Sequence, residues 1–285
     1  MSARRAILVV NATRPEAVQA ATSLASLLSE GAFEIFTASA VNISQVKNVN
    51  VDQLPDAEIV IVLGGDGTIL RGAEISRLRK IPLLGVNLGH VGFMAEVEKL
   101  SLETVAASVI AKSYATDPRM VLAYSVERDG KEVSSGWSLN EVTIERTEST
   151  MVELLVQVDR RPLSRWGCDG LIAATPTGST AYAFSAGGPV LWPNLDAVIL
   201  LPISAHALFS RPMVISHKSE IVVEVESVAA KLSADALREF PLMQGDRVTI
   251  TGDESVVLLA HVQPTLFTDR LVAKFKLPVE GWRGE

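Results

Sequence analysis

The sequence has little cysteine, no long apolar run and no excess of positive charge. A single cysteine, Cys168, among 285 residues excludes an internal disulfide and a cysteine-based zinc cluster. No stretch approaches the roughly 18 consecutive apolar residues of a membrane helix, so we expect no membrane partner. A net charge of −7 offers no broad basic surface to a nucleic-acid backbone. We therefore expect a cytoplasmic protein that acts on small molecules and binds neither nucleic acid nor membrane.

Hydrophobic residues are abundant, at 48%, and in the first third of the chain they alternate between strand-like and helical spacing. The strand-like stretches are residues 5–11, 33–39, 58–63 and 82–87, and the helical ones are 15–31, 69–80 and 102–114. Strands that alternate with helices are typical of a parallel sheet with right-handed crossovers. The pattern predicts an α/β N-terminal domain with a parallel sheet over residues 1–117.

From residue 118 the helical spacing gives way to short alternating strands. An Asp129-Gly130 pair separates two of them, as in a hairpin turn, and the strand pattern continues through residues 255–262. This predicts a β-rich, sandwich-like C-terminal domain over residues 118–265. A helical pattern returns at residues 268–276, and we expect the tail, 266–285, to pack back on the first domain.

A glycine-rich loop follows the strand-like stretch that ends at Leu63. Gly64, Gly65 and Gly67 open a helix there, and their backbone N–H groups suit a phosphate. Neither standard phosphate-loop pattern is present, because no lysine follows and Leu70 occupies the last glycine position of G-x-G-x-x-G. Since phosphates repel a carboxylate, Asp66 is better suited to a hydroxyl or Mg²⁺. The alternative is that Asp66 belongs to a plain turn and helix cap.

Two further segments carry polar groups. Hydroxyl residues surround Gly178 before an apolar stretch, a pattern of a helix N-terminus that suits a sugar or phosphate: Thr175, Thr177, Ser179 and Thr180. An isolated cluster of this kind is more often an ordinary capped helix. Asn140 and Glu141 precede the strand residues 142–144, and such a pair is usually a solvated strand end. Neither segment identifies a ligand by itself.

Together these segments resemble the NAD kinase family. The resemblance is carried by residues 64–68 (GGDGT), 140–141 (NE) and 175–182 (TPTGSTAY), and residues 89–93 (GHVGF) are similar to the family's glycine-phenylalanine loop. It covers most of the chain, and the ending, 267–284, is similar to that of actinobacterial members. Lipid kinases and 6-phosphofructokinases carry loops similar to GGDGT, so the TPTGSTAY segment is the more specific part.

The resemblance implies a function and a set of site residues. It implies transfer of a phosphoryl group from ATP or inorganic polyphosphate to the 2′-hydroxyl of the adenosine ribose of NAD, with a divalent metal such as Mg²⁺. Asp66 is then the catalytic residue that accepts or orients the proton of that hydroxyl. The residues implied to bind NAD are Asp66, Gly67, Arg71, Phe93, Asn140, Glu141, Asp169, Thr180, Ala181, Tyr182 and Ser185, and the phosphate loop comprises Gly64, Gly65, Gly67 and Thr68. No metal ligand is assigned.

Some positions depart from the family pattern. Cys168 stands where many members have glycine, and we interpret it as a small buried hydrophobe. Asp235-Ala236 replaces a late Asp-Gly pair, which leaves any ligand role for Asp235 open. We interpret Trp137, Trp166 and Trp192 as core residues.

Three questions remain open at this stage. The alternatives to an NAD kinase are a lipid or sugar kinase with the GGDGT loop and a non-catalytic dinucleotide-binding regulator. Family members are commonly dimers or tetramers, so a homodimer or homotetramer is expected. The sequence does not choose between ATP and polyphosphate.

Overall fold

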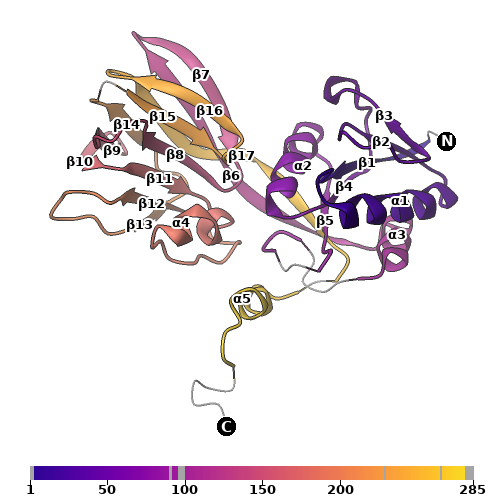
Figure 1. The fold of residues 1–285 in the computed structure, drawn as a ribbon. Coiled ribbons are helices and arrows are strands. Elements are labelled where there is room, and N and C mark those ends of the chain that lie inside the picture. The colour runs from indigo at the N-terminus through magenta and orange to yellow at the C-terminus, as the bar shows by residue number, and fades with distance from the viewer. Residues whose placement is uncertain (1–2, 90–91, 96–99, 228, 264, 280–285) are drawn as a thin grey trace. The chain divides into compact units, whose positions relative to one another are not determined.

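The computed structural model describes residues 3–89, 92–95, 100–227, 229–263 and 265–279. The chain divides into two compact units, which we call unit 1 (Met1–Pro118 with Val257–Glu285) and unit 2 (Arg119–Val256) (Figure 1). The predicted domains, residues 1–117 and 118–265 with a tail at 266–285, are parts expected to fold independently. Compactness does not establish independent folding, so these ranges stay a prediction. No helix within the described residues is long and apolar enough to cross a membrane.

Unit 1 contains a parallel sheet. Its strands are β1 (Arg4–Val10), β2 (Phe33–Thr37), β3 (Val46–Asn48), β4 (Ile59–Leu63), β5 (Leu83–Val86) and the last residues of β17 (Arg247–His261). They lie in the order β17-β5-β4-β1-β2-β3, and these neighbours pair in parallel. The predicted α/β domain with a parallel sheet is confirmed, although the same sheet continues along β17 into antiparallel pairs of unit 2.

The helices of unit 1 are α1 (Pro15–Glu30), α2 (Asp66–Arg79), α3 (Leu102–Ala111) and α5 (Phe267–Phe275), with a short 3-10 helix η1 (Val51–Gln53). Helices α1 and α3 pack together and share one hydrophobic core with alternate residues of β4, Ile59, Ile61 and Leu63. The intervening Val60 and Val62 face α2, where a Cβ added to Gly72 would come within 2.5 Å of Val62. Both faces of β4 are therefore buried, which explains its uninterrupted apolar sequence.

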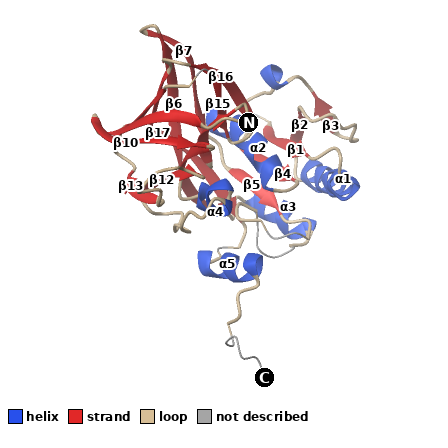
Figure 2. Cartoon of the chain, turned by 60° about the vertical axis from the view of Figure 1, so that its left-hand side comes forward, coloured by secondary structure: helices blue, strands red, loops and turns tan. Residues whose placement is uncertain are grey.

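Unit 2 consists of two antiparallel β-sheets (Figure 2). One has the order β13-β12-β11-β8-β15-β16, formed by β8 (Glu141–Arg146), β11 (Gly170–Ala174), β12 (Ala197–Ile203), β13 (Met213–Ser216), β15 (Ala229–Ala234) and β16 (Arg238–Met243). The other runs β10-β9-β14-β17, with β6 beside β17 and β7 beside β6. It is formed by β6 (Ala115–Arg128), β7 (Lys131–Ser138), β9 (Val152–Val158), β10 (Arg161–Cys168), β14 (Ile221–Val225) and β17.

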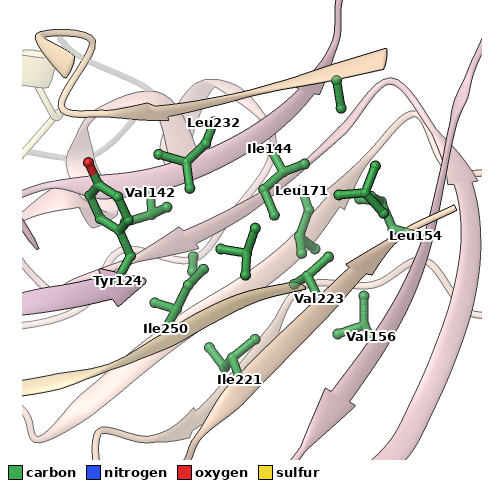
Figure 3. Packing of buried hydrophobic residues seen from close by; sticks show 14 of the residues in the cluster. Tyr124, Val142, Ile144, Leu154, Val156, Leu171, Ile221, Val223, Leu232 and Ile250 are labelled. Atoms are coloured by element: carbon green, nitrogen blue, oxygen red, sulfur yellow. The ribbon is translucent and has the colours of Figure 1, made fainter. Parts of the chain in front are cut away.

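The two sheets of unit 2 enclose one hydrophobic core (Figure 3). It combines Val142, Ile144, Leu171 and Leu232 from one sheet with Leu154, Val156, Ile221, Val223 and Ile250 from the other. Inward-facing residues alternate along β9, as expected of a sandwich. This confirms the predicted β-rich, sandwich-like fold.

The structure corrects two local predictions and confirms two others. The apolar stretch after the hydroxyl cluster is no long helix: it forms a 3-10 turn, η2 (Gly178–Thr180), and the one-turn helix α4 (Tyr182–Ser185). Trp192 is 47% exposed and is not a core residue, whereas Trp166 is fully buried. The hairpin at Asp129-Gly130 is confirmed, with both residues at positive φ as a tight hairpin turn requires.

The tail forms the predicted helix, α5, within unit 1. The Phe93 ring packs between the rings of Phe267 and Phe275, at centroid distances of 6.3 and 5.6 Å. The buried Arg270 guanidinium donates to the carbonyl oxygens of Phe93 and Ala95. The helix thus holds the segment around Phe93 from one side.

Candidate functional site

The Asp66 carboxylate lies at the start of α2 in unit 1. Gly65 is the N-cap, and no side chain caps this helix, so the interpretation of Asp66 as a helix cap is wrong. Oδ2 of Asp66 accepts the backbone N–H of Phe93 at 3.5 Å, whereas Oδ1 is buried and has no hydrogen-bond partner among the described residues. A Cβ added to Gly92 would collide with Oδ1, so the glycine makes room for the carboxylate. One carboxylate oxygen is left for a ligand.

The glycines of the GGDGT loop have different reasons to be glycine. A Cβ at Gly64 would collide with the Thr68 side chain, so packing requires that glycine. Around Gly65 and Gly67 an added Cβ would meet nothing within 4 Å, and Gly65 has an ordinary φ of −89°. Neither packing nor backbone conformation accounts for these two residues. The predicted close approach of a phosphate to the backbone is consistent with this open space, at a helix N-terminus whose first N–H groups lack intrahelical acceptors, and it stays a prediction.

The Asn140-Glu141 pair of unit 2 lies at the start of β8 and is buried, with 7% and 6% of each residue exposed. The interpretation as a solvated strand end is therefore wrong. Burial, reinforced by the nearby charge of Asp235, raises the pKa of Glu141 to about 8, while the backbone N–H of Tyr182 acts in the opposite direction. Oε2 of Glu141 is buried and finds no hydrogen-bond partner in the part of the chain that the structure describes.

The hydroxyls of the TPTGST segment mostly serve the fold. Thr175 Oγ1 donates to the Leu139 carbonyl at 2.6 Å and accepts the N–H of Gly178 at 3.0 Å. Ser179 Oγ donates to the Pro176 carbonyl and accepts the N–H of Leu191. Both residues are fully buried. These hydroxyls shape the turn after β11 and are committed within it.

Gly178 joins this turn to the Asn140-Glu141 corner. A Cβ there would collide with the backbone of Asn140, and the N–H of Thr175 donates to the Asn140 carbonyl at 2.8 Å. Two segments distant in the sequence are thereby packed as one piece.

The other predicted NAD-binding residues differ in how they are held. In unit 1, Arg71 is exposed on α2 and Phe93 is buried. In unit 2, Asp169 forms an ion pair with Arg146 at 2.7 Å, and Thr180 Oγ1 donates to the Thr177 carbonyl at 3.3 Å. Ala181 is half-buried, and Tyr182 and Ser185 are exposed. Within the GHVGF segment, His90 and Val91 lie outside the described residues. The roles of all these residues stay predictions.

Sequence reasoning left Asp235 without a role, and the structure gives it one. Its carboxylate is buried and accepts the backbone N–H groups of Leu139, Asn140 and Glu141. The sequence signal was a lone aspartate between two strand patterns, which usually indicates only a turn. Cys168 is fully buried, and burial raises its pKa to about 12, which confirms the interpretation as an inert core residue.

Comparison with known proteins decides the family. The ATP-NAD kinase N-terminal domain model matches residues 6–114, and the C-terminal domain model matches residues 139–261. The chain belongs to the NAD kinase family. The NAD kinase of Leifsonia xyli is 46% identical, covering 100% of this chain and 98% of the relative. That of Corynebacterium glutamicum is 49% identical, covering 82% and 81%, and that of Mycobacterium bovis is 42% identical over the full length of both chains.

Solved structures agree with this assignment. An NAD kinase from Archaeoglobus fulgidus in complex with ATP has a TM-score of 0.68 and 26% identity, covering 94% of this chain and 98% of its own. Yeast NADH kinase complexed with NADH has a TM-score of 0.87 at 20% identity, covering 99% and 90%, which shows the shared fold. The predictions of an enzyme of the NAD kinase family, a phosphotransferase that makes NADP from NAD, are confirmed. A lipid or sugar kinase and a non-catalytic regulator lose their support.

Proposed function

We propose that the chain transfers the terminal phosphoryl group of ATP to the 2′-hydroxyl of the adenosine ribose of NAD, with inorganic polyphosphate as a second possible donor. One observation carries the residue assignment: Oδ1 of Asp66 and Oε2 of Glu141 are buried carboxylate oxygens without a partner. Such atoms lose their hydrogen bonds to bulk water on folding, and a donor group of a ligand can replace them. The hydroxyl groups of a ribose are donors of the required kind.

Asp66 acts on the attacking hydroxyl. As the 2′-oxygen forms its bond to the terminal phosphorus, the hydroxyl proton moves to Oδ1. The bond to the bridging oxygen breaks, and ADP departs with that electron pair. The N–H of Phe93 contacts the other oxygen at 3.5 Å, whereas Oδ1 has no such contact and can accept the proton. The open backbone at Gly65 and Gly67, with the N-terminus of α2, offers a favourable place for phosphate charge.

Unit 2 supplies the recognition groups for NAD. The Asn140 amide suits a base edge, and the Glu141 carboxylate suits a ribose hydroxyl. The exposed Tyr182 ring suits stacking. Support for these roles comes from the buried, oriented Asn140-Glu141 corner. We propose that the remaining contacts to NAD are made by Gly67, Arg71, Phe93, Asp169, Thr180, Ala181 and Ser185.

A divalent metal fits this site only in company with the donor. No group of three or more His, Cys, Asp or Glu side chains lies together in the part of the chain that the structure describes. Mg²⁺ in kinases is commonly held by one or two carboxylates together with substrate phosphates, which requires no protein cage. When bound, the metal would neutralise charge on the phosphates. We assign no protein ligand to the metal, because the proposal uses Oδ1 of Asp66 for the hydroxyl proton.

We also propose a cytoplasmic location and a homodimer or homotetramer. The strands β13 and β16 are the edges of one sheet in unit 2, and β13 exposes 50% of Val214. An exposed apolar edge strand is suited to pairing with another copy. Size-exclusion chromatography with light scattering measures the assembly directly.

The deciding experiment supplies NAD and Mg²⁺ with either ATP or inorganic polyphosphate, and detects NADP with an NADP-specific dehydrogenase. We expect NADP with ATP, and the polyphosphate reaction shows whether the second donor is used. Diacylglycerol, sphingosine and fructose 6-phosphate are the control acceptors, and none should be phosphorylated. Turnover of a control acceptor without any NADP formation would contradict the proposal.

A further inference from the structure

Asp235 lies in the tight turn between β15 and β16, with 4% of the residue exposed. Oδ1 accepts the backbone N–H groups of Asn140 at 2.7 Å and Glu141 at 3.3 Å, and Oδ2 accepts that of Leu139 at 2.8 Å. The backbone N–H of Asp235 itself donates to the Glu141 carbonyl at 3.1 Å. One side chain therefore fixes three consecutive peptide units that immediately precede or begin β8.

Arg238 holds the Asp235 carboxylate in this place. Its guanidinium forms an ion pair with Oδ2 of Asp235 at 3.3 Å and lies 4.9 Å from the ring centroid of Trp137. It also donates to the Trp137 carbonyl oxygen. Burial raises the pKa of Asp235, and the three backbone N–H groups and the Arg238 guanidinium act in the opposite direction by favouring its ionised form.

Two carboxyl groups thus share one buried region. Glu141 is influenced by the charges of Asp235 from the β15–β16 turn and Glu145 from its own strand, with the Tyr182 N–H opposing them. Arg238 is the cation that acts on Asp235. Burial and the neighbouring carboxylate both disfavour a second negative charge on Glu141. The proton on Glu141 therefore depends on Asp235.

We propose that Asp235 is a positioning residue of the NAD site: it orients Asn140 and Glu141 through their backbone and makes NAD binding depend on the protonation of Glu141. This inference rests on the proposed binding of NAD by that pair. Asp235 itself touches no substrate in this scheme. A ribose hydroxyl donates best to ionised Glu141, so NAD binding near neutral pH displaces a proton from that carboxyl into solvent.

The wild-type protein provides the first test. NAD alone, without a phosphoryl donor, is titrated calorimetrically in buffers of different ionisation enthalpy. Because burial and Asp235 raise the pKa of Glu141 to about 8, we expect release of about half a proton per NAD at pH 8 and less above pH 9. A binding heat that is independent of the buffer over this range would overturn the proposal.

The second test replaces the charge and keeps the shape. Asp235→Asn loses the negative charge and presents an amide donor to one of the backbone N–H groups. We expect proton release to move about one pH unit or more towards acid. At pH 9, where Glu141 is ionised in both proteins, the KM for NAD should be about tenfold higher, with a much smaller change in kcat.

Asp246→Asn is the matched control. Asp246 is also a buried aspartate of unit 2, and it accepts a backbone N–H from Met243 and the guanidinium of Arg128. This variant should lower the Tm without changing the pH profile or the KM for NAD. If Asp235→Asn behaves like Asp246→Asn, Asp235 is merely structural and the inference is wrong.

Glu141→Gln distinguishes the proposed binding of NAD by Glu141 from the inferred role of Asp235. Under the proposed function it weakens NAD binding, and under the further inference it also abolishes proton release. If NAD affinity is unchanged, the role of the Asn140-Glu141 pair fails, and with it the inference. Weaker binding of Glu141→Gln, combined with wild-type proton release, would contradict only the inference.

Discussion

The two segments that most resemble the family are built in opposite ways. In the GGDGT loop of unit 1, Gly65 and Gly67 leave open space, and Asp66 keeps a buried oxygen without a partner. In the TPTGST segment of unit 2, Thr175 and Ser179 are fully buried and use their hydroxyls on the backbone around them. A motif can therefore mark ligand chemistry in one place and the construction of a corner in another.

This difference changes how the polar residues of the chain are interpreted. A hydroxyl-rich segment suggests direct contacts to a sugar or phosphate, yet its buried members orient the neighbouring Asn140 and Glu141 instead. In the glycine loop, by contrast, the proposed function uses the open backbone at Gly65 and Gly67. The comparison predicts that variants of the glycine loop affect catalysis and that variants of the TPTGST segment affect stability, and the opposite pattern would contradict it.

Asp66→Asn should have the largest effect. The amide retains the volume but cannot accept the proton, so we expect kcat to fall by about 10² to 10⁴ while NAD binding survives. Turnover is measured with ATP and Mg²⁺, and NAD affinity by calorimetry. The exposed Asp56→Asn in the same unit is the control and should be as active as wild type. Near-normal turnover of Asp66→Asn would remove the catalytic role.

Gly67→Ala and Gly178→Ala form a pair that tests the comparison directly. An alanine at Gly67 enters open space, so the Tm should not fall, whereas kcat/KM should drop by about 10- to 100-fold because the added methyl displaces the donor. An alanine at Gly178 collides with Asn140 and should cost at least about 1–3 kcal/mol of unfolding free energy. An active Gly67→Ala variant would show that this loop does not approach the donor.

Thr175→Val should act on stability alone. It leaves the Leu139 carbonyl and the Gly178 N–H buried without their partner, at a cost of about 1–3 kcal/mol in urea unfolding. The kcat of the folded fraction should remain near wild type, since this hydroxyl is committed within the turn. A variant of normal stability with a lost kcat would instead make Thr175 a substrate contact.

Ala236→Gly should give the smallest effect, and a favourable one. Ala236 has φ of +52° in the β15–β16 turn, a left-handed conformation that costs an alanine about 1 kcal/mol relative to glycine. Allowing for the greater entropy of glycine in the unfolded chain, we expect a gain of about 0.5 kcal/mol. Thermal unfolding measures it, and an unchanged KM for NAD shows that Asp235 still holds its corner.

The sequence was sufficient for many of the regular elements because their hydrophobic spacing is local. Helix α1 begins at Pro15 and ends before Gly31, as the apolar period and these two residues predict. The strand β4 and the hairpin at Asp129-Gly130 follow from equally local signals. The short strand β3 was not predicted, because three half-exposed and exposed residues carry no periodicity.

The arrangement around the candidate site was only partly predictable. Asp66 and Glu141 were identified by resemblance, but their unpartnered oxygens depend on contacts distant in sequence, such as that between Gly92 and Asp66. The Asp235 contacts join positions more than 90 residues apart, and nothing in an Ala-Asp-Ala sequence indicates them. Trp192 was misjudged because size and hydrophobicity alone do not determine depth.

The buried position of the single thiol, Cys168, makes its reactivity a measure of local unfolding. Cys168 lies in the core between the sheets of unit 2, and burial raises its pKa to about 12, so a thiol reagent has no access to a reactive thiolate in the closed structure. Unit 1 contains no cysteine at all. The rate of alkylation therefore counts the openings of the sandwich alone, in the intact enzyme and without an engineered label.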